Sequence, residues 1–190
     1  MKLVFATHNP NKFEEIKSLL PEHIELLSLH DIDCNEDIEE TGDTIDENAI
    51  IKAEYVCNHY GYDCFADDTG LEVNSLAGAP GVFSARYAGE HKDDEANIKK
   101  LLNQLDEKED RSAQFKTVIA LNLKGKQNLF TGICKGTILD RKKGNKGFGY
   151  DPVFQPEGLD KSFAEMELAE KSIISHRGQA FRELIAYLSN

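Results

Sequence analysis

The chain reads Phe65-Ala66-Asp67-Asp68-Thr69-Gly70 where a short apolar segment meets two adjacent carboxylates. The apolar run predicts a strand over residues 63–66 that delivers both acids into a turn. Because adjacent side chains cannot face the same way, we expect one acid to bind a metal or a water and the other to support the turn or a neighbouring lysine. Aspartate-rich turns also arise for structural reasons alone, since their side chains bond to the backbone. Both interpretations of the pair stay open from these residues alone.

Helices and strands interleave on both sides of this stretch. Asn9-Pro10 predicts a helix start, and Thr44 with Glu47 forms a capping box. The turn Lys124-Gly125-Lys126 predicts a hairpin. The expected strands cover residues 3–6, 24–29, 63–66, 113–123, 129–139 and 153–154, and the remaining helices cover 93–105 and the segment around 181–188. The pattern therefore predicts an α/β fold with a mixed, partly antiparallel sheet flanked by helices.

Composition limits the possible partners. A chain of 190 residues, 40% of them hydrophobic, predicts one domain over residues 1–190 with a core of its own. The net charge of −12 argues against nucleic acid and against an anionic membrane surface, because both require a basic face. An anionic substrate would need a locally positive pocket or a divalent cation. No signal peptide or membrane-spanning run is visible, so a cytoplasmic location is expected. The four cysteines form no C-x-x-C pair, so no zinc site is predicted.

A polar loop follows the first expected strand and precedes the first expected helix. It reads Thr7-His8-Asn9-Pro10-Asn11-Lys12. Backbone N–H groups and the helix dipole favour an anion at such a position. Thr7 and Asn9 can add side-chain donors, and Lys12 adds a mobile charge. The alternative is a capped helix with a solvated lysine, since the stretch is not a Walker motif.

Glu40 and the Asp67-Asp68 pair are the candidate metal ligands. Magnesium takes oxygen ligands and usually needs only one or two protein carboxylates. Lys52 lies in the helix that begins near Thr44, where it could neutralise phosphate or pair with Asp67. Alternatively, Glu40 is one more solvated acid in the acidic loop over residues 33–46.

Two further segments could recognise a base or a phosphate. In Gly147-Phe148-Gly149-Tyr150-Asp151 the glycines clear space around Phe148, whose ring could stack on a base. The alternative is a tight turn with Phe148 folded into the core. Lys171 and Ser175-His176-Arg177 could contact a keto oxygen or phosphate, or could simply start a helix with surface charges. Lys146 is a further candidate cation.

Taken together and in order, these segments closely resemble the inosine triphosphate pyrophosphatase family over nearly the whole chain. The resemblance implies a two-lobed ITPase-like fold of the Maf/Ham1 type with a central cleft. It also implies a homodimer, magnesium dependence and hydrolysis of non-standard purine nucleoside triphosphates to monophosphate and pyrophosphate. The family-like stretches are residues 6–12, 39–42, 47–49, 66–71, 78–87, 147–152 and 175–180.

Roles follow from the resemblance position by position. Glu40 and Asp68 would hold Mg²⁺, and Asp68 would also orient or deprotonate the attacking water. Thr69 would contact the substrate, and Phe148 would stack on the purine. The triphosphate would be held by Thr7, His8, Asn9, Pro10, Asn11 and Lys12, and recognition of base and phosphate would be completed by Gly149, Tyr150, Asp151, Lys171, His176 and Arg177.

Three other functions compete with this one. A related house-cleaning pyrophosphatase for pyrimidine or modified nucleotides would need a different base pocket. A nucleotide-binding module that does not hydrolyse would not need Glu40, Asp68 and Lys12 together. A purely structural protein would leave the acid pair and the aromatic glycine loop unexplained.

Overall fold

The computed structural model describes residues 1–17 and 19–189, except for the side chains of Asn11 and Glu15. The chain divides into two compact units, each assembled from separate stretches. The first unit contains Met1–Asp68, Val118–Thr131 and Ala180–Asn190. The second contains Thr69–Thr117 and Gly132–Gln179. Chain segments far apart in sequence therefore build each unit.

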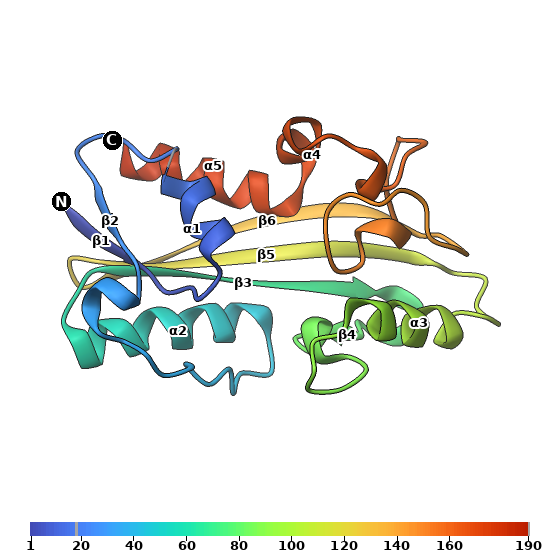
Figure 1. Ribbon diagram of the computed structural model, residues 1–190, viewed down its shortest axis with the longest axis horizontal. Helices are drawn as coiled ribbons and strands as arrows, with labels where there is room; N and C mark the ends of the chain where they lie inside the picture. The colour runs from blue at the N-terminus through green and yellow to red at the C-terminus, as the bar shows by residue number, and fades with distance from the viewer. Residues whose placement is uncertain (18, 190) are drawn as a thin grey trace. The chain divides into compact units, whose positions relative to one another are not determined.

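The strands of the described residues join in one mixed sheet (Figure 1). Its order is β2-β1-β3-β5-β6-β7, with β4 also paired to β3. β1 runs parallel to β2 and β3, whereas β4 is antiparallel to β3 and β7 is antiparallel to β6. This confirms the predicted mixed α/β class. The strands are β1 Lys2–Phe5, β2 Glu25–Leu27, β3 Cys64–Val73, β4 Pro80–Gly81, β5 Ser112–Leu123, β6 Lys126–Ile138 and β7 Phe154–Pro156.

The predicted turn at the acid pair is wrong. β3 continues through both aspartates and Thr69 for ten residues. The pleat turns Asp67 inward, where it is 3% exposed, and leaves Asp68 half-buried. The expectation that the two acids face different ways is therefore met by strand alternation rather than by a turn.

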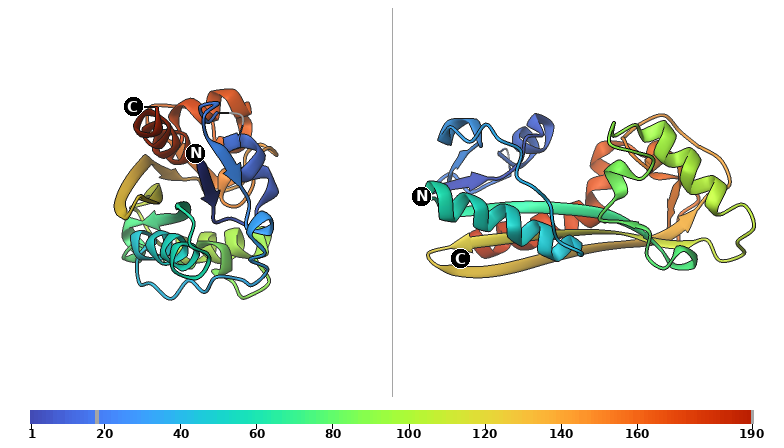
Figure 2. Two further views of the ribbon diagram at one scale, coloured as in Figure 1. Left: turned by 90° about the vertical axis from the view of Figure 1, so that its left-hand side faces the viewer. Right: turned by 90° about the horizontal axis from the view of Figure 1, so that it is seen from below.

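Helices cover both faces of the sheet in the first unit. These are α1 (Pro10–Lys17), α2 (Ile45–Tyr60) and the end of α5 (His176–Leu188). α1 and α5 lie on one side of the strands and α2 lies on the other (Figures 1 and 2). The core beneath α5 contains Phe5 and Phe65, whose rings stack with centroids 4.5 Å apart. Phe181 of α5 meets Phe5 edge-on, at a centroid distance of 6.0 Å.

The predicted helix starts of this unit are confirmed. The backbone N–H of Lys12 donates to Asn9 Oδ1 over 3.2 Å, which caps α1. At α2, Thr44 and Glu47 cap each other's backbone as predicted, and Gly61 ends the helix with φ +72°. The start of α2 fixes the end of the acidic loop, which is important for the site below.

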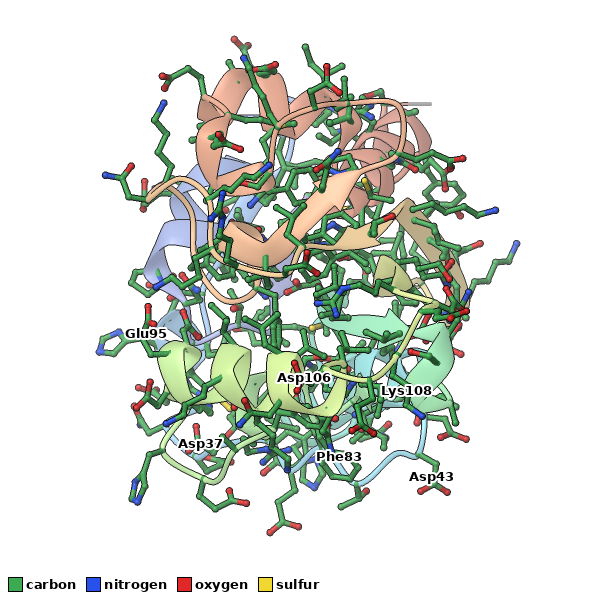
Figure 3. The ribbon with its side chains drawn as sticks, turned by 90° about the vertical axis from the view of Figure 1, so that its right-hand side faces the viewer. Asp37, Asp43, Phe83, Glu95, Asp106 and Lys108 are labelled. Carbon is green, nitrogen blue, oxygen red and sulfur yellow. The ribbon has the colours of Figure 1, made fainter. Side chains whose placement is uncertain are left out.

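The second unit has its own core and its own helices. α3 (Asp94–Gln104) is capped by Asp93, buries Ile98 and Leu101 and turns Glu95 outward (Figure 3). α4 (Leu168–Ile174) was not predicted from the sequence. The core of the unit is rich in aromatic rings, with Phe115, Phe154 and Phe163 in mutual contact.

Several strand boundaries differ from the prediction. β2 is shorter than expected, and β6 begins three residues before 129. The turn before β6 uses positive φ at Lys124 and Gly125, which suits a two-residue hairpin. None of the helices in the described residues combines the length and apolar composition needed to cross a bilayer.

Candidate functional site

Lys52 brings together the predicted metal ligands of the first unit. Its ammonium group donates to Glu40 Oε1 over 2.5 Å and to the backbone carbonyl of Asp67 over 2.8 Å. It also lies 3.4 Å from Asp68 Oδ1. The Lys52 side chain is only 12% exposed. Two carboxylates from distant parts of the sequence thus converge on one cationic group.

The pKa of Lys52 reports the strength of this environment. Burial favours the neutral amine and would lower the pKa. The negative charges of Asp68, Glu40 and Asp67 outweigh that effect and raise the pKa above its ordinary value. The surrounding carboxylates therefore stabilise the charged form of Lys52 despite its burial.

Lys12 forms the second ion pair of the first unit. Its Nζ lies 2.6 Å from Asp67 Oδ2, and the Asp67 side chain is 1% exposed. The sequence suggested Lys52 as the partner of Asp67. Instead the Asp67 carboxylate bonds to Lys12 of α1, and Lys52 contacts the Asp67 main chain.

The loop between β1 and α1 satisfies several of its own polar groups. The backbone N–H of Asn9 donates to Thr7 Oγ1, and Thr7 N–H donates to the carbonyl of Phe5. These bonds shape the loop but use amides that we expected to face an anion. His8 Nε2 lies 3.2 Å from the backbone carbonyl of Glu36. Pro10 begins α1 as predicted, and the side chain of Asn11 lies outside the described residues.

The carboxylates fit the chemistry of a magnesium site. Glu40 and Asp68 already share one cationic partner, the ammonium group of Lys52. Among the described residues, no group of three or more His, Cys, Asp or Glu side chains is arranged to hold a metal. A two-carboxylate site remains compatible with Mg²⁺, which retains waters and binds substrate phosphates.

The glycine loop of the second unit is organised around Asp151. Asp151 Oδ2 accepts from the backbone N–H of Phe148 over 3.0 Å and from Lys171 Nζ over 2.5 Å. Gly147 has φ +74°, and a Cβ there would lie 2.0 Å from the same oxygen. The loop therefore requires glycine at 147, and the buried Asp151 acts on the loop from inside.

Phe148 is held outward by this arrangement. Its side chain is 59% exposed, which rules out the alternative of a ring folded into the core. Lys171 Nζ and the Arg177 guanidinium each lie 5.4 Å from the ring centroid. Cations at this distance interact favourably with an aromatic face. An exposed aromatic surface supported by two cations results.

Three other residues of this unit that were predicted to contact the substrate bond to or stack on groups of the protein itself. Tyr150 is buried and donates to the carbonyl of Ser84, while burial raises its pKa. His176 is 5% exposed and stacks on Phe115, with centroids 4.6 Å apart. Thr69 shares a hydrogen bond of 2.7 Å with Thr117. These contacts fix the positions of side chains that the resemblance assigns to the substrate.

Sequence reasoning missed some supporting residues. Gly149 N–H donates to Asp94 Oδ2 over 2.7 Å, so the first turn of α3 holds the glycine loop. The Asp93-Asp94 pair is visible in the sequence, but the glycine that Asp94 contacts is 55 residues away, and no local pattern connects the two. Lys146, a candidate cation, forms an exposed ion pair with Glu167.

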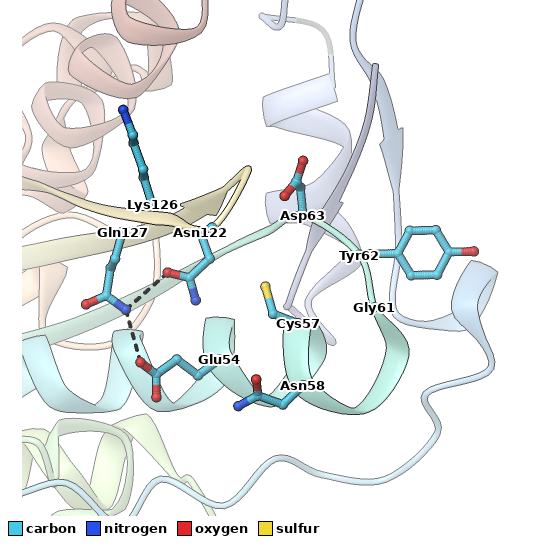
Figure 4. A pocket seen from close by; sticks show the side chains of 10 residues that line it. Glu54, Cys57, Asn58, Gly61, Tyr62, Asp63, Asn122, Lys126 and Gln127 are labelled. Carbon is cyan, nitrogen blue, oxygen red and sulfur yellow. Dashed lines mark hydrogen bonds between the residues drawn. The ribbon is translucent and has the colours of Figure 1, made fainter.

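A separate hollow of about 470 Å³ lies within the first unit (Figure 4). It is lined by Glu54, Cys57, Asn58, Gly61, Tyr62, Asp63, Asn122, Gly125, Lys126 and Gln127. None of these lining residues is among the predicted site residues. The charged networks described above are therefore not part of this hollow.

Comparisons with known proteins identify the family of the chain. Residues 3–187 match the Ham1 family. The chain belongs to the Ham1 family. The "dITP/XTP pyrophosphatase" of Christiangramia forsetii is 79% identical and covers 100% of both chains. The protein of the same name from Porphyromonas gingivalis is 51% identical, over 98% of this chain and 97% of that one.

Solved structures of the family confirm the fold. The Staphylococcus aureus Ham1 protein superposes with a TM-score of 0.95 at 43% identity, covering 100% of this chain and 98% of that chain. A Ham1 protein from Coxiella burnetii gives the same TM-score at 39% identity and the same coverage. The resemblance inferred from the motifs is thus confirmed over the full length.

Proposed function

We propose that the chain hydrolyses non-standard purine nucleoside triphosphates, such as ITP, dITP and XTP, to the monophosphate and pyrophosphate. The observation that carries the proposal is the convergence of Glu40 and Asp68 on Lys52, with Lys12 bonded to the neighbouring Asp67. A protein that only bound nucleotides would not need this cluster. Relatives up to 79% identical bear the name "dITP/XTP pyrophosphatase".

In the proposed reaction, a water oxygen attacks the α-phosphorus and the bond to the bridging oxygen of the β-phosphate breaks. Asp68 orients this water or accepts its proton. Lys12 and Lys52 offset the charge that develops on the leaving pyrophosphate, and such preorganised electrostatics is usually the largest catalytic contribution. Mg²⁺ bound by Glu40 and Asp68 would supply Lewis-acid polarisation of the phosphate oxygens.

The second unit supplies the elements proposed to recognise the base. Phe148 would stack on the purine through its exposed ring. Arg177 or His176 would donate to the keto oxygen at the 6-position. ATP carries an amino donor there, so donors would face a donor, and an unsatisfied buried polar group costs about 1–3 kcal/mol. Lys171 and Asp151 would keep Phe148 in place.

A substrate panel tests the proposal. We expect rapid pyrophosphate release from ITP and XTP with Mg²⁺, and a kcat/KM for ATP lower by at least about 10²-fold, because sites built around one hydrogen bond discriminate strongly. Chelation with EDTA should abolish release, and added Mg²⁺ should restore it. Equal efficiency on ITP and ATP would reject the keto-recognising site, and preference for dUTP or TTP would favour the pyrimidine alternative.

Two further proposals concern the setting of the reaction. One is a homodimer, which light scattering of the purified protein measures directly. The other is a cytoplasmic location. A single functional domain is proposed from the length and composition of the chain. Mg²⁺ as the cofactor is proposed from the family resemblance, and the two-carboxylate chemistry of Glu40 and Asp68 supports it.

A further inference from the structure

The segment that carries Glu40 has little structure of its own. Residues 34–44 contain no helix or strand. At one end, Cys34 is buried and its backbone N–H bonds to the carbonyl of Leu29. At the other end, the N–H of Gly42 donates to Asn48 Oδ1 over 2.8 Å, and the capping box holds Thr44. Glu40 therefore lies on a long connection whose course must be fixed by side chains.

Two tyrosines of α2 bind this segment at Glu36. Tyr55 and Tyr60 donate their hydroxyls to the same oxygen, Glu36 Oε1, over 2.8 and 2.7 Å. The Tyr55 ring stacks on His59, with centroids 4.2 Å apart, so its hydroxyl is presented by a supported ring. The hydrogen bonds from Tyr60 and then Tyr55 lower the pKa of Glu36 to about 2. The carboxylate is thus an ionised acceptor across the physiological pH range.

Three successive contacts join the acidic segment to one face of α2. Asn48 holds Gly42, Lys52 holds Glu40, and Tyr55 holds Glu36. Residues 48, 52 and 55 follow the i, i+4, i+7 spacing of one helix face. The acidic segment runs back along α2 in the opposite direction (Figure 1). Glu40 makes the middle contact, and the contact at Glu36 keeps the preceding residues against the helix.

Glu36 also touches the loop between β1 and α1, just before the helix that carries Lys12. Its backbone carbonyl lies 3.2 Å from His8 Nε2, and the same nitrogen lies 3.7 Å from Asp37 Oδ1. One residue therefore contacts α2 through its side chain and the loop between β1 and α1 through its main chain. The two loops assigned to the metal and to the phosphates meet at this residue.

We propose that Glu36 is a positioning residue, which Tyr55 and Tyr60 hold so that Glu40 stays in place for the cation. The inference rests on the proposed function only for its consequence in catalysis. Its structural content, an acidic segment pinned to α2 by two hydroxyls, stands independently. Glu36 bonds to Tyr55 and Tyr60 through its side chain and contacts His8 through its main chain, so it acts through the segment and not on the substrate.

The test removes both hydroxyls and keeps both rings, in the double variant Tyr55→Phe/Tyr60→Phe. Without Mg²⁺ or nucleotide, we expect hydrogen exchange of the backbone amides of residues 35–41 to accelerate at least about tenfold. Exchange in α2 should stay unchanged. With ITP, the Mg²⁺ concentration for half-maximal activity should rise about 10-fold or more, the size typical of lost supporting contacts at metal sites. Tyr62→Phe is the matched control, because it removes a hydroxyl that takes part in none of these contacts. It should change neither the hydrogen exchange of residues 35–41 nor the Mg²⁺ requirement.

The outcomes separate the possibilities. Unchanged exchange in residues 35–41 would overturn the pinning, and faster exchange with an unchanged Mg²⁺ requirement would overturn the link to Glu40. If the double variant does not fold, Glu36→Gln takes its place, since it keeps an accepting oxygen but removes the charge; we expect smaller changes in the same direction. If wild-type protein released no pyrophosphate at all, the proposed function would fail while the exchange result would still decide the pinning.

Discussion

In each of the two units, burial and nearby charge have opposite effects on the pKa of one side chain, and the outcome differs between the units. In the first unit, burial would lower the pKa of Lys52, but the surrounding carboxylates raise it. In the second unit, the charge of Lys171 favours the thiolate of Cys134, but burial raises the pKa of that thiol to about 11. Charge therefore prevails over burial around Lys52, and burial prevails over charge around Cys134.

The surroundings explain the difference. Lys12 and Lys52 face three carboxylates, those of Glu40, Asp67 and Asp68. Lys171 pairs with the carboxylate of Asp151 and lies over two rings, at 5.0 Å from the centroid of Phe163 and 5.4 Å from that of Phe148. In the proposed function, the first region serves the cation and the phosphates, and the second holds the purine ring. Loss of the first should affect turnover, and loss of the second should affect binding.

The largest effect is expected from Asp68→Asn. The amide keeps the shape of the side chain but removes its charge and its basicity. We expect kcat for ITP to fall by about 10³-fold, within the range that general-base and electrostatic catalysis supply, with nucleotide binding nearly unchanged. Steady-state kinetics and equilibrium binding of ITP measure the two effects.

Asp63→Asn is the matched control for this variant. Asp63 precedes β3 in the same unit, and its carboxylate accepts the backbone N–H of Lys124 over 2.8 Å. Its amide can accept the same bond, so turnover should be retained. Near-normal turnover of Asp68→Asn would remove the distinction between the two regions.

The acid pair shows how far sequence reasoning reaches. Local signals predicted α1 and the capping box of α2, since each depends on residues close in sequence, whereas they left open whether Phe148 points outward or into the core. The course of β3 was mispredicted because aspartate is rare in strands and common in turns. Asp67 is tolerated in the strand because Lys12, 55 residues earlier, pairs with it. No local pattern contains that information.

The candidate site divides along the same line. Motifs and the family resemblance selected Glu40, Asp68 and Lys12. In the structure, Glu40 and Asp68 pair with Lys52, and Lys12 pairs with Asp67. The supporting roles were not predictable. Asp151 turned out to be buried against Lys171 and Phe148, and Tyr55 with Tyr60 bind Glu36 across a connection without regular structure.

Phe148→Ala should give an intermediate effect, confined to binding. Stacking of a base on an aromatic ring contributes about 1–3 kcal/mol, so the KM for ITP should rise by roughly 5- to 150-fold, while kcat changes much less. Because the ring is 59% exposed, the melting temperature should be nearly unaffected.

Phe83→Ala is the control for this variant. Phe83 belongs to the same unit and is 62% exposed (Figure 3). It makes the same chemical change at a residue with no assigned contact to the substrate, so the KM should stay near the wild-type value. A fall in kcat without a rise in KM for Phe148→Ala would contradict the division between turnover and binding.

The smallest effect is expected from Cys134→Ala, measured on stability at alkaline pH. The Cys134 side chain is buried in β6, and burial raises its pKa from 9.0 to about 11 despite Lys171. Between these values the unfolded chain releases the thiol proton and the folded protein retains it. The free energy of unfolding of the wild type must therefore decrease as pH rises from 9 to 11.

Alanine removes this proton, so the variant should lose on the order of 1–2 kcal/mol less stability than the wild type over that interval. Urea unfolding at pH 8, 9, 10 and 11 measures the difference, and the value at pH 8 corrects for the packing lost with the sulfur. Cys134→Ser should follow the same flatter curve, because its hydroxyl does not titrate in this range. If the free energy of unfolding fell equally with pH in the wild type and both variants, the thiol of Cys134 would not have a raised pKa. Lys171 would then stabilise the thiolate as effectively as the carboxylates stabilise the charge of Lys52. The contrast between the two units would in that case depend on the number of charges rather than on burial.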